Sequence, residues 1–78
     1  MNYEDEQKRA LIFLERKTLV HISTTRLLPN TDKEYWFNGI ILEVGTNFFI
    51  AKDRVGGQEQ LILFSELKKS LEPYTEKE

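Results

Sequence analysis

The sequence has no cysteine and only one histidine among its 78 residues. Without cysteine there is no disulfide framework, no thiolate cage for a metal and no thiol nucleophile. A structural zinc site would have to take most of its ligands from carboxylates, which is uncommon. We therefore expect neither a metal site nor a cofactor.

Long apolar runs are also missing. Near the N-terminus the longest spans residues 10–14, with Arg9 before it and residues 15–17 (Glu-Arg-Lys) after it. A run this short does not cross a bilayer, and the acidic start around Glu4 is unlike a signal peptide. We expect a cytoplasmic protein with no membrane contact.

No excess of positive charge is present. Eleven basic and 13 acidic residues give a net charge of −2. This balance excludes a protein that coats duplex nucleic acid through bulk charge, although it leaves a local basic site open. Apolar residues make up 40% and charged residues 31% of the chain, which is ordinary for one folded domain over residues 1–78.

Residues 2–17 are predicted to form a helix that lies on the domain. Asn2 is a plausible N-cap, and acidic residues at 4–6 and basic residues at 16–17 both suit the helix dipole. The side that faces the domain is only partly apolar and is expected to carry Tyr3, Gln7, Ala10, Leu11 and Leu14, with Phe13 beside it.

The rest of the chain, residues 18–74, predicts a small five-stranded bent antiparallel β-barrel, so the fold class is all-β with an N-terminal helix. Alternation places Val20, Ile22 and Thr24 on one face of the first strand. Gly39, in the middle of the second strand, is expected to mark a bulge or sharp bend. The other strands are expected at residues 48–51, 60–64 and 69–72.

Two of these strands carry further expectations. The nearly continuous apolar stretch at 60–64 predicts a strand covered on both faces. Pro73 is expected to end the last strand, before a charged tail at residues 75–78.

The order of elements, with Phe37-x-Gly39-x-Ile41 followed by residues 44–53 (VGTNFFIAKD), resembles the Sm-like family, which includes Sm, LSm and the bacterial host factor Hfq. Residues 61–64 and 71–74 are similar to the family's fourth and fifth strands. The likeness covers roughly residues 18–74. It implies a barrel whose subunits pair their edge strands into a homo-oligomer, with tentative interface residues Trp36, Leu61, Leu63 and Leu71.

The resemblance implies a non-catalytic module that binds single-stranded RNA. The tentative RNA-binding residues are Asn47, Phe48, Lys52, Arg54, Lys68 and Lys69. The chain also departs from the family, because Ser65-Glu66 stands where the family carries a basic pair. The acidic net charge and this lost pair leave a second hypothesis open, a protein–protein adaptor that uses Trp36, Tyr35 and residues 27–28 (Leu-Leu).

Catalysis is not expected. His21 and Ser23 share a strand face, but we expect the reach between them within one strand to be poor, and no motif supports a triad.

Overall fold

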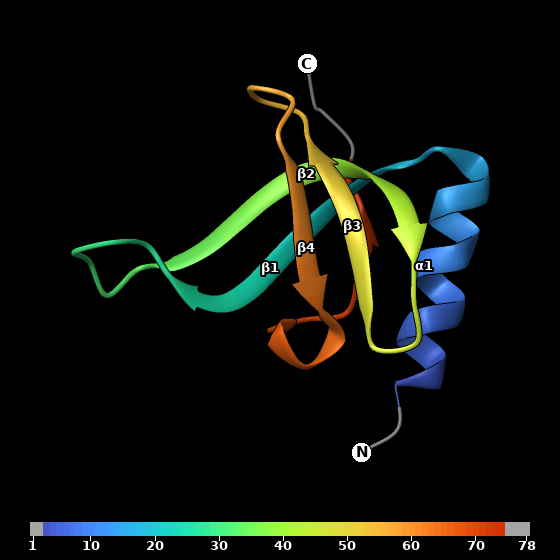
Figure 1. Cartoon of the computed structure of the whole chain (residues 1–78), viewed down its shortest axis with the longest axis horizontal. Helices are drawn as coiled ribbons and strands as arrows, with labels where there is room; N and C mark the ends of the chain where they lie inside the picture. Colours follow the sequence, from blue (N-terminus) through green and yellow to red (C-terminus); the bar gives the residue numbers. More distant parts are fainter. Residues whose placement is uncertain (1–2, 75–78) are drawn as a thin grey trace.

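The computed structural model describes residues 3–74, which form one helix, five strands and a single 3₁₀ turn (Figure 1). In chain order these are α1 (Glu4–Arg16), β1 (Leu19–Leu27), β2 (Glu34–Val44), β3 (Phe48–Asp53), β4 (Glu59–Leu63), η1 (Phe64–Glu66) and β5 (Glu72–Pro73). The predicted helix and five strands are therefore confirmed within this range. The charged tail predicted at residues 75–78 lies outside the described residues.

All five strands belong to one open antiparallel sheet in the order β4-β3-β2-β1-β5. β4 and β5 are its two edges. The long strands β1 and β2 form a hairpin whose tip projects away from the rest of the molecule (Figure 1). Beyond Ser23, β1 turns toward the segment after η1, where Thr24 bridges Leu67 and the Lys68 N–H donates to the Ser23 carbonyl over 2.9 Å.

The irregularity in β2 lies at Leu42 and not at Gly39. The register with β3 shifts between Ile41 and Glu43, whereas Gly39 pairs in regular register with Val20 and Asp53. A β-carbon at Gly39 would lie 2.4 Å from the carbonyl oxygen of Lys52. The glycine is there because β3 passes too close for any side chain, so a bulge at Gly39 was the wrong prediction.

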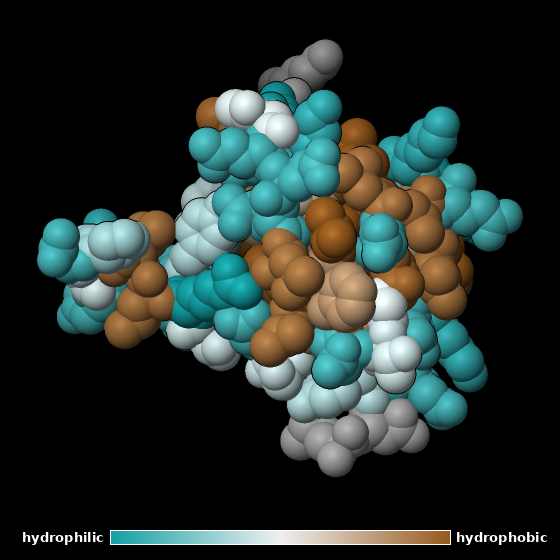
Figure 2. All heavy atoms as spheres, in the orientation of Figure 1, coloured by the Kyte–Doolittle hydropathy of each residue, from teal (hydrophilic) through white to brown (hydrophobic). Residues whose placement is uncertain are grey.

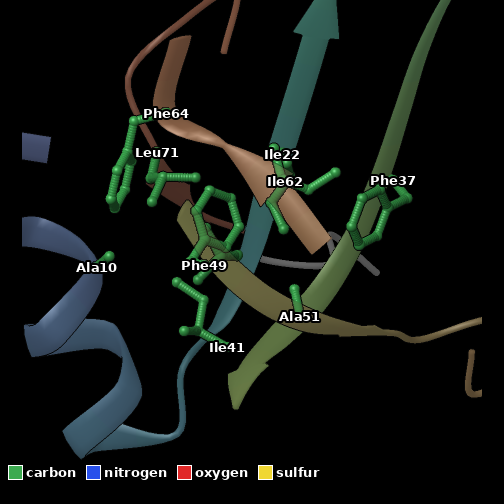
Figure 3. Packing of buried hydrophobic residues seen from close by; sticks show 10 residues of the cluster. Ala10, Ile22, Phe37, Ile41, Phe49, Ala51, Ile62, Phe64 and Leu71 are labelled. Carbon is green, nitrogen blue, oxygen red and sulfur yellow. The ribbon is translucent and has the colours of Figure 1, made fainter. Parts of the chain in front are cut away.

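The core lies inside the curve of the sheet, and α1 closes one end of it with Ala10 (Figure 3). Its buried apolar residues come from the helix, from β1 to β4, and from the segment that leads to β5: Ala10, Val20, Ile22, Phe37, Ile41, Phe49, Ala51, Ile62, Phe64 and Leu71. Thr24 is also fully buried, and its hydroxyl donates to the Tyr35 carbonyl over 2.6 Å. The predicted buried face of β1 is thus confirmed, and its polar member is satisfied by a hydrogen bond.

The helix α1 covers one side of the sheet and is tied to it at both polar and apolar points. Ala10 is buried, and Tyr3, Phe13 and Leu14 pack against the core, but Leu11 is 45% exposed and does not join them. Gln7 donates to the Gly45 carbonyl over 3.0 Å. The helix is 13 residues long, and no helix within residues 3–74 has the length and apolar character of a membrane span.

The C-terminal end of α1 lies close to the predicted one, whereas its N-terminal end differs from the prediction. The predicted N-cap, Asn2, lies outside the described residues, and Tyr3 occupies the N-cap position without a side-chain cap. At the other end Lys17 adopts a left-handed conformation with φ of 54°, and its N–H bonds the Leu14 carbonyl. The helix therefore ends at a residue in the left-handed conformation, a position that glycine occupies more often than lysine.

Two predictions about the edge strands were wrong. In β4 only one face is covered, because Leu61 is 49% and Leu63 38% exposed while Ile62 is buried. The last strand, β5, spans Glu72–Pro73 and not residues 69–72, although it ends at Pro73 as predicted, and Pro73 pairs with Val20. A proline has no N–H to donate. An edge strand tolerates a proline because the strand has no neighbour to bond on the side that faces away from the sheet.

Candidate functional site

An aromatic row crosses the outer face of β2, β1 and the residue after β5. Trp36 of β2 is 59% exposed, and its ring centroid lies 5.4 Å from that of His21 on β1. Tyr74 stacks against His21 from the other side, with centroids 6.4 Å apart. Strand alternation sends these side chains outward, because Phe37 and Ile22, their neighbours in sequence, point into the core. Of these three side chains Trp36 is exposed, whereas His21 and Tyr74 are half-buried.

A chain of hydrogen bonds fixes the middle of this row. The Nδ1 of His21 lies 2.7 Å from Asn38 Oδ1, and its Nε2 lies 3.2 Å from Ser23 Oγ. Because the amide oxygen only accepts, Nδ1 carries a proton and Nε2 is free to accept from the Ser23 hydroxyl. The expectation that Ser23 cannot reach His21 within one strand was wrong. The chain holds the imidazole ring in place beside Trp36.

Trp36 separates two hollows on this surface. The larger one, about 370 Å³, lies between Trp36, Ser23, Glu34 and the pair Lys68 and Lys69. The smaller one, about 270 Å³, is lined by Trp36 together with Asn38, Asp53, Arg54 and Val55. Both contain cationic side chains beside the same exposed indole. We call this surface, made by Trp36 and its two hollows, the Trp36 platform.

The structure divides the tentative RNA-binding residues among different places. Arg54 lies on one side of the Trp36 platform and Lys68 with Lys69 on the other. Lys52 is next to Arg54, in a neighbouring hollow of about 320 Å³.

The two remaining residues lie at the opposite end of β3, Asn47 in the turn before the strand and Phe48 at its first position. There the Asn47 carbonyl accepts from the Phe64 N–H over 3.0 Å. Phe48 is half-buried, and its ring lies so close to Gly45 that a β-carbon there would be 2.3 Å from it. Asn47 and Phe48 are thus not part of the surface that holds Arg54, Lys68 and Lys69.

The charges around the platform are mixed. Lys68 forms an ion pair with Glu34, and Asp53 accepts a hydrogen bond from the Val55 N–H over 2.9 Å within its own turn. Arg26 is bound to Glu66 and lines neither hollow. Acidic groups therefore stand beside the cations in both hollows, Glu34 in the larger and Asp53 in the smaller.

A second distinctive surface is apolar. Ile40, Leu42, Leu61 and Leu63 are each between 38% and 49% exposed on the outer side of β2 and β4. Ile50 of β3 pairs with Leu61 and lies between these strands. Figure 2 shows apolar side chains gathered in the centre of the face on which β3 and β4 lie in front. We call these five residues the apolar face.

Of the tentative interface residues, Trp36, Leu61 and Leu63 are at the surface and Leu71 is not. Leu71 is 1% exposed and belongs to the core beside Phe49 and Phe64 (Figure 3). It follows η1 and turns inward under α1, where its N–H donates to Glu6 over 3.1 Å. Its assignment to an interface was therefore wrong.

An ion pair that the sequence did not predict bridges β1, η1 and β4. Arg26 Nε lies 2.6 Å from Glu66 Oε2, and Arg26 Nη2 donates both to Glu66 Oε1 and to the Leu61 carbonyl, each over 2.8 Å. Glu66 Oε1 also accepts from the Leu63 N–H over 3.0 Å. The hydrogen bonds from Arg26 lower the pKa of Glu66, with help from the Leu63 N–H, and the bonds to Glu66 raise the pKa of Arg26. We call this pair with its two backbone bonds the β4 clasp.

Tyr35 lies at the base of the hairpin, on the inner side of β2. Its ring stacks on Phe37 with centroids 5.5 Å apart, and its hydroxyl accepts from Gln60 over 3.1 Å. Burial raises the pKa of Tyr35, and the negative charge of Asp53 adds to this rise. Because its ring packs inward, Tyr35 is a supporting residue and not a surface contact.

The comparisons with known proteins were negative: no family model, no curated protein and no solved structure matches the chain.

Proposed function

We propose that this chain is a non-catalytic binding domain of Sm-like type and that its ligand is single-stranded RNA. A helix followed by five antiparallel strands, with a one-turn connector between β4 and β5, is the layout that the resemblance to the Sm-like family implies. The proposed contact surface differs from the one expected from sequence. It is the Trp36 platform, and it leaves out Asn47 and Phe48.

The observation that carries the proposal is an exposed indole flanked by cations on both sides. The ring of His21 packs against Trp36. Arg54 lines the hollow on one side of Trp36, and Lys69 lines the hollow on the other side. A base that stacks on an aromatic side chain gains about 1–3 kcal/mol, whatever its identity. Phosphates on either side of that base would meet the cations. The site is small and mixed in charge, which favours a short flexible strand over a rigid duplex.

Replacing Trp36 with alanine is expected to weaken binding of short U-rich or A-rich RNA by roughly 5- to 150-fold, the equivalent of one lost stacking contact. Trp36 is the only tryptophan of the chain, so its fluorescence in the unmodified protein reports on the site directly. Binding should quench this fluorescence, and the affinity should fall as salt rises. Fluorescence titration and anisotropy of labelled RNA at low salt measure both effects.

The matched control is Val55→Ala. Val55 is the most exposed large apolar residue within residues 3–74, at 79%, and lines the smaller hollow without offering a ring to stack on. The Val55→Ala variant should bind RNA with the affinity of the unmodified protein, and the Trp36→Phe variant should retain most of that affinity. Absence of quenching at low salt, or equal binding by Trp36→Ala and Val55→Ala, would count against the proposal.

A second function, protein–protein adaptor, is favoured by the apolar face. Several neighbouring apolar side chains on the outside of a small sheet are typical of a surface that contacts another protein. Replacing Leu42 with lysine would place a charge in this face and should abolish recovery of a partner that survives ribonuclease treatment, while Trp36→Ala should not. Recovery that depends on Trp36 and is lost after ribonuclease treatment would instead favour the RNA function.

A further inference from the structure

The β4 clasp occupies backbone groups that face away from the sheet. The Phe64 N–H bonds the Asn47 carbonyl, so at this end of the ladder the backbone of Phe64 points toward β3. Backbone direction alternates along a strand, and the N–H and C=O groups of Leu61 and Leu63 therefore point to the free edge. At these two strand positions Arg26 donates to the Leu61 carbonyl, and Glu66 accepts from the Leu63 N–H.

An uncovered strand edge is a template for another strand, and proteins commonly block it with charged side chains. Here the block is more specific than a charge, because the guanidinium and the carboxylate bond to the very groups that a neighbouring strand would use. Leu61 and Leu63 are also apolar and exposed, so the strand has the composition that favours pairing once its edge is bare.

We infer that the β4 clasp keeps this chain from associating through β4, and that opening it makes the β4 edge a docking site for β4 of a second copy. The homo-oligomer predicted from sequence would then form only when Arg26 and Glu66 release the edge. The clasp is a removable cover, since both side chains are partly exposed, at 38% and 23%.

The second copy is the best match for this edge because β4 can pair with itself. In an antiparallel arrangement centred on Leu61, the N–H and C=O of Leu61 bond the same groups of its counterpart, and Glu59 faces Leu63. The resulting interface is two-fold and closes on itself. The other edge strand is a poorer partner, because β5 has only two residues and one is Pro73, which has no N–H to donate.

The test is the mass in solution, by light scattering coupled to size exclusion, of the full chain at micromolar concentration. The unmodified protein should be a monomer. Arg26→Ala frees the Leu61 carbonyl and Glu66→Ala frees the Leu63 N–H, and each should double the mass. The charge-swapped variant Arg26→Glu with Glu66→Arg should also dimerise, because a carboxylate at position 26 has no proton to donate to the Leu61 carbonyl.

Two further variants identify the surface. Leu61→Pro removes an N–H that points to the free edge and leaves the ladder with β3 intact, so Arg26→Ala combined with Leu61→Pro should return to a monomer. Lys68→Gln breaks the ion pair with Glu34 and should leave the mass unchanged, because the atoms of that pair bond each other and no backbone group of β4. Circular dichroism verifies that each variant is folded, and Glu66→Ala carries the test if Arg26→Ala does not fold.

Three results would overturn the inference. The first is an Arg26→Ala or Glu66→Ala protein that is folded and monomeric. The second is a dimer of Arg26→Ala that persists after Leu61→Pro is added. The third is an unmodified protein that is already a dimer and becomes a monomer through Leu61→Pro alone.

Discussion

Replacing Phe49 with alanine is expected to lower the free energy of unfolding by about 3–5 kcal/mol, the usual loss for a large aromatic side chain removed from a core. A domain of this size typically has about 4–12 kcal/mol in total, so the variant should be largely unfolded or close to it at room temperature. Urea denaturation followed by circular dichroism measures the loss.

The size of this effect follows from the position of Phe49. The side chain is fully buried, and its ring lies 5.5 Å from that of Phe64 (Figure 3). Ile62 is its direct partner across β3 and β4, and Leu71 and Ala10 belong to the same cluster. A cavity at this point therefore removes contacts from the sheet, from η1 and from the helix at once.

The neighbouring phenylalanine provides the control. Phe48 is half-buried on the opposite side of β3, so Phe48→Ala should lower the stability by clearly less than Phe49→Ala. Equal losses for the two variants would show that the core is not centred on Phe49.

Replacing Gly39 with alanine is expected to lower the free energy of unfolding by about 2–3 kcal/mol, although it adds only one methyl group. The new β-carbon would lie 2.4 Å from the Lys52 carbonyl oxygen and 3.2 Å from a ring carbon of Phe37. The nearer atom belongs to the backbone of β3, which cannot move without breaking the pairing of Gly39 with Asp53. Thermal unfolding followed by circular dichroism gives the shift in midpoint.

Substitution of a second glycine is the control that distinguishes the steric effect at Gly39 from the general effect of replacing any glycine. Gly56 has a φ of 86° and open space around it, so Gly56→Ala carries only the backbone strain of a left-handed residue, about 1–2 kcal/mol. Ile40→Ala, at an exposed position next to Gly39, should be nearly neutral. A loss for Gly39→Ala no larger than that for Ile40→Ala would mean that β2 and β3 are less closely packed than described.

Local patterns were enough to predict the elements of this fold. The alternation of Val20, Ile22 and Thr24 gave the buried face of β1 correctly, because a period of two depends only on neighbours in the chain. The same rule misled at β4, where a continuous apolar stretch suggested cover on both faces. Leu61 and Leu63 are exposed because β4 is at the sheet edge, and a strand's position in the sheet is not encoded in its own residues.

The site was harder to predict because its contacts join distant parts of the chain. Trp36 was named from the sequence as a candidate interface residue, and it lies at the surface. Its support by His21 depends on the register of β1 against β2, which sets His21 opposite Asn38. The β4 clasp joins residues 40 positions apart, and neither Arg26 nor Glu66 stands in a motif that would single it out. Knowledge of the strand order would have been needed to find either contact.

The pairing of β1 has a consequence for synthesis on the ribosome. One edge of β1 is covered by β2, which follows directly, but the other edge is completed only by Leu67, Lys68 and β5. A nascent chain that has emerged as far as β4 thus still lacks the bonds along this second edge of β1, and it lacks Leu71 from the core. The last step of folding must wait for these final segments to leave the exit tunnel, and a stalled chain would expose a bare strand to its neighbours on the same messenger RNA.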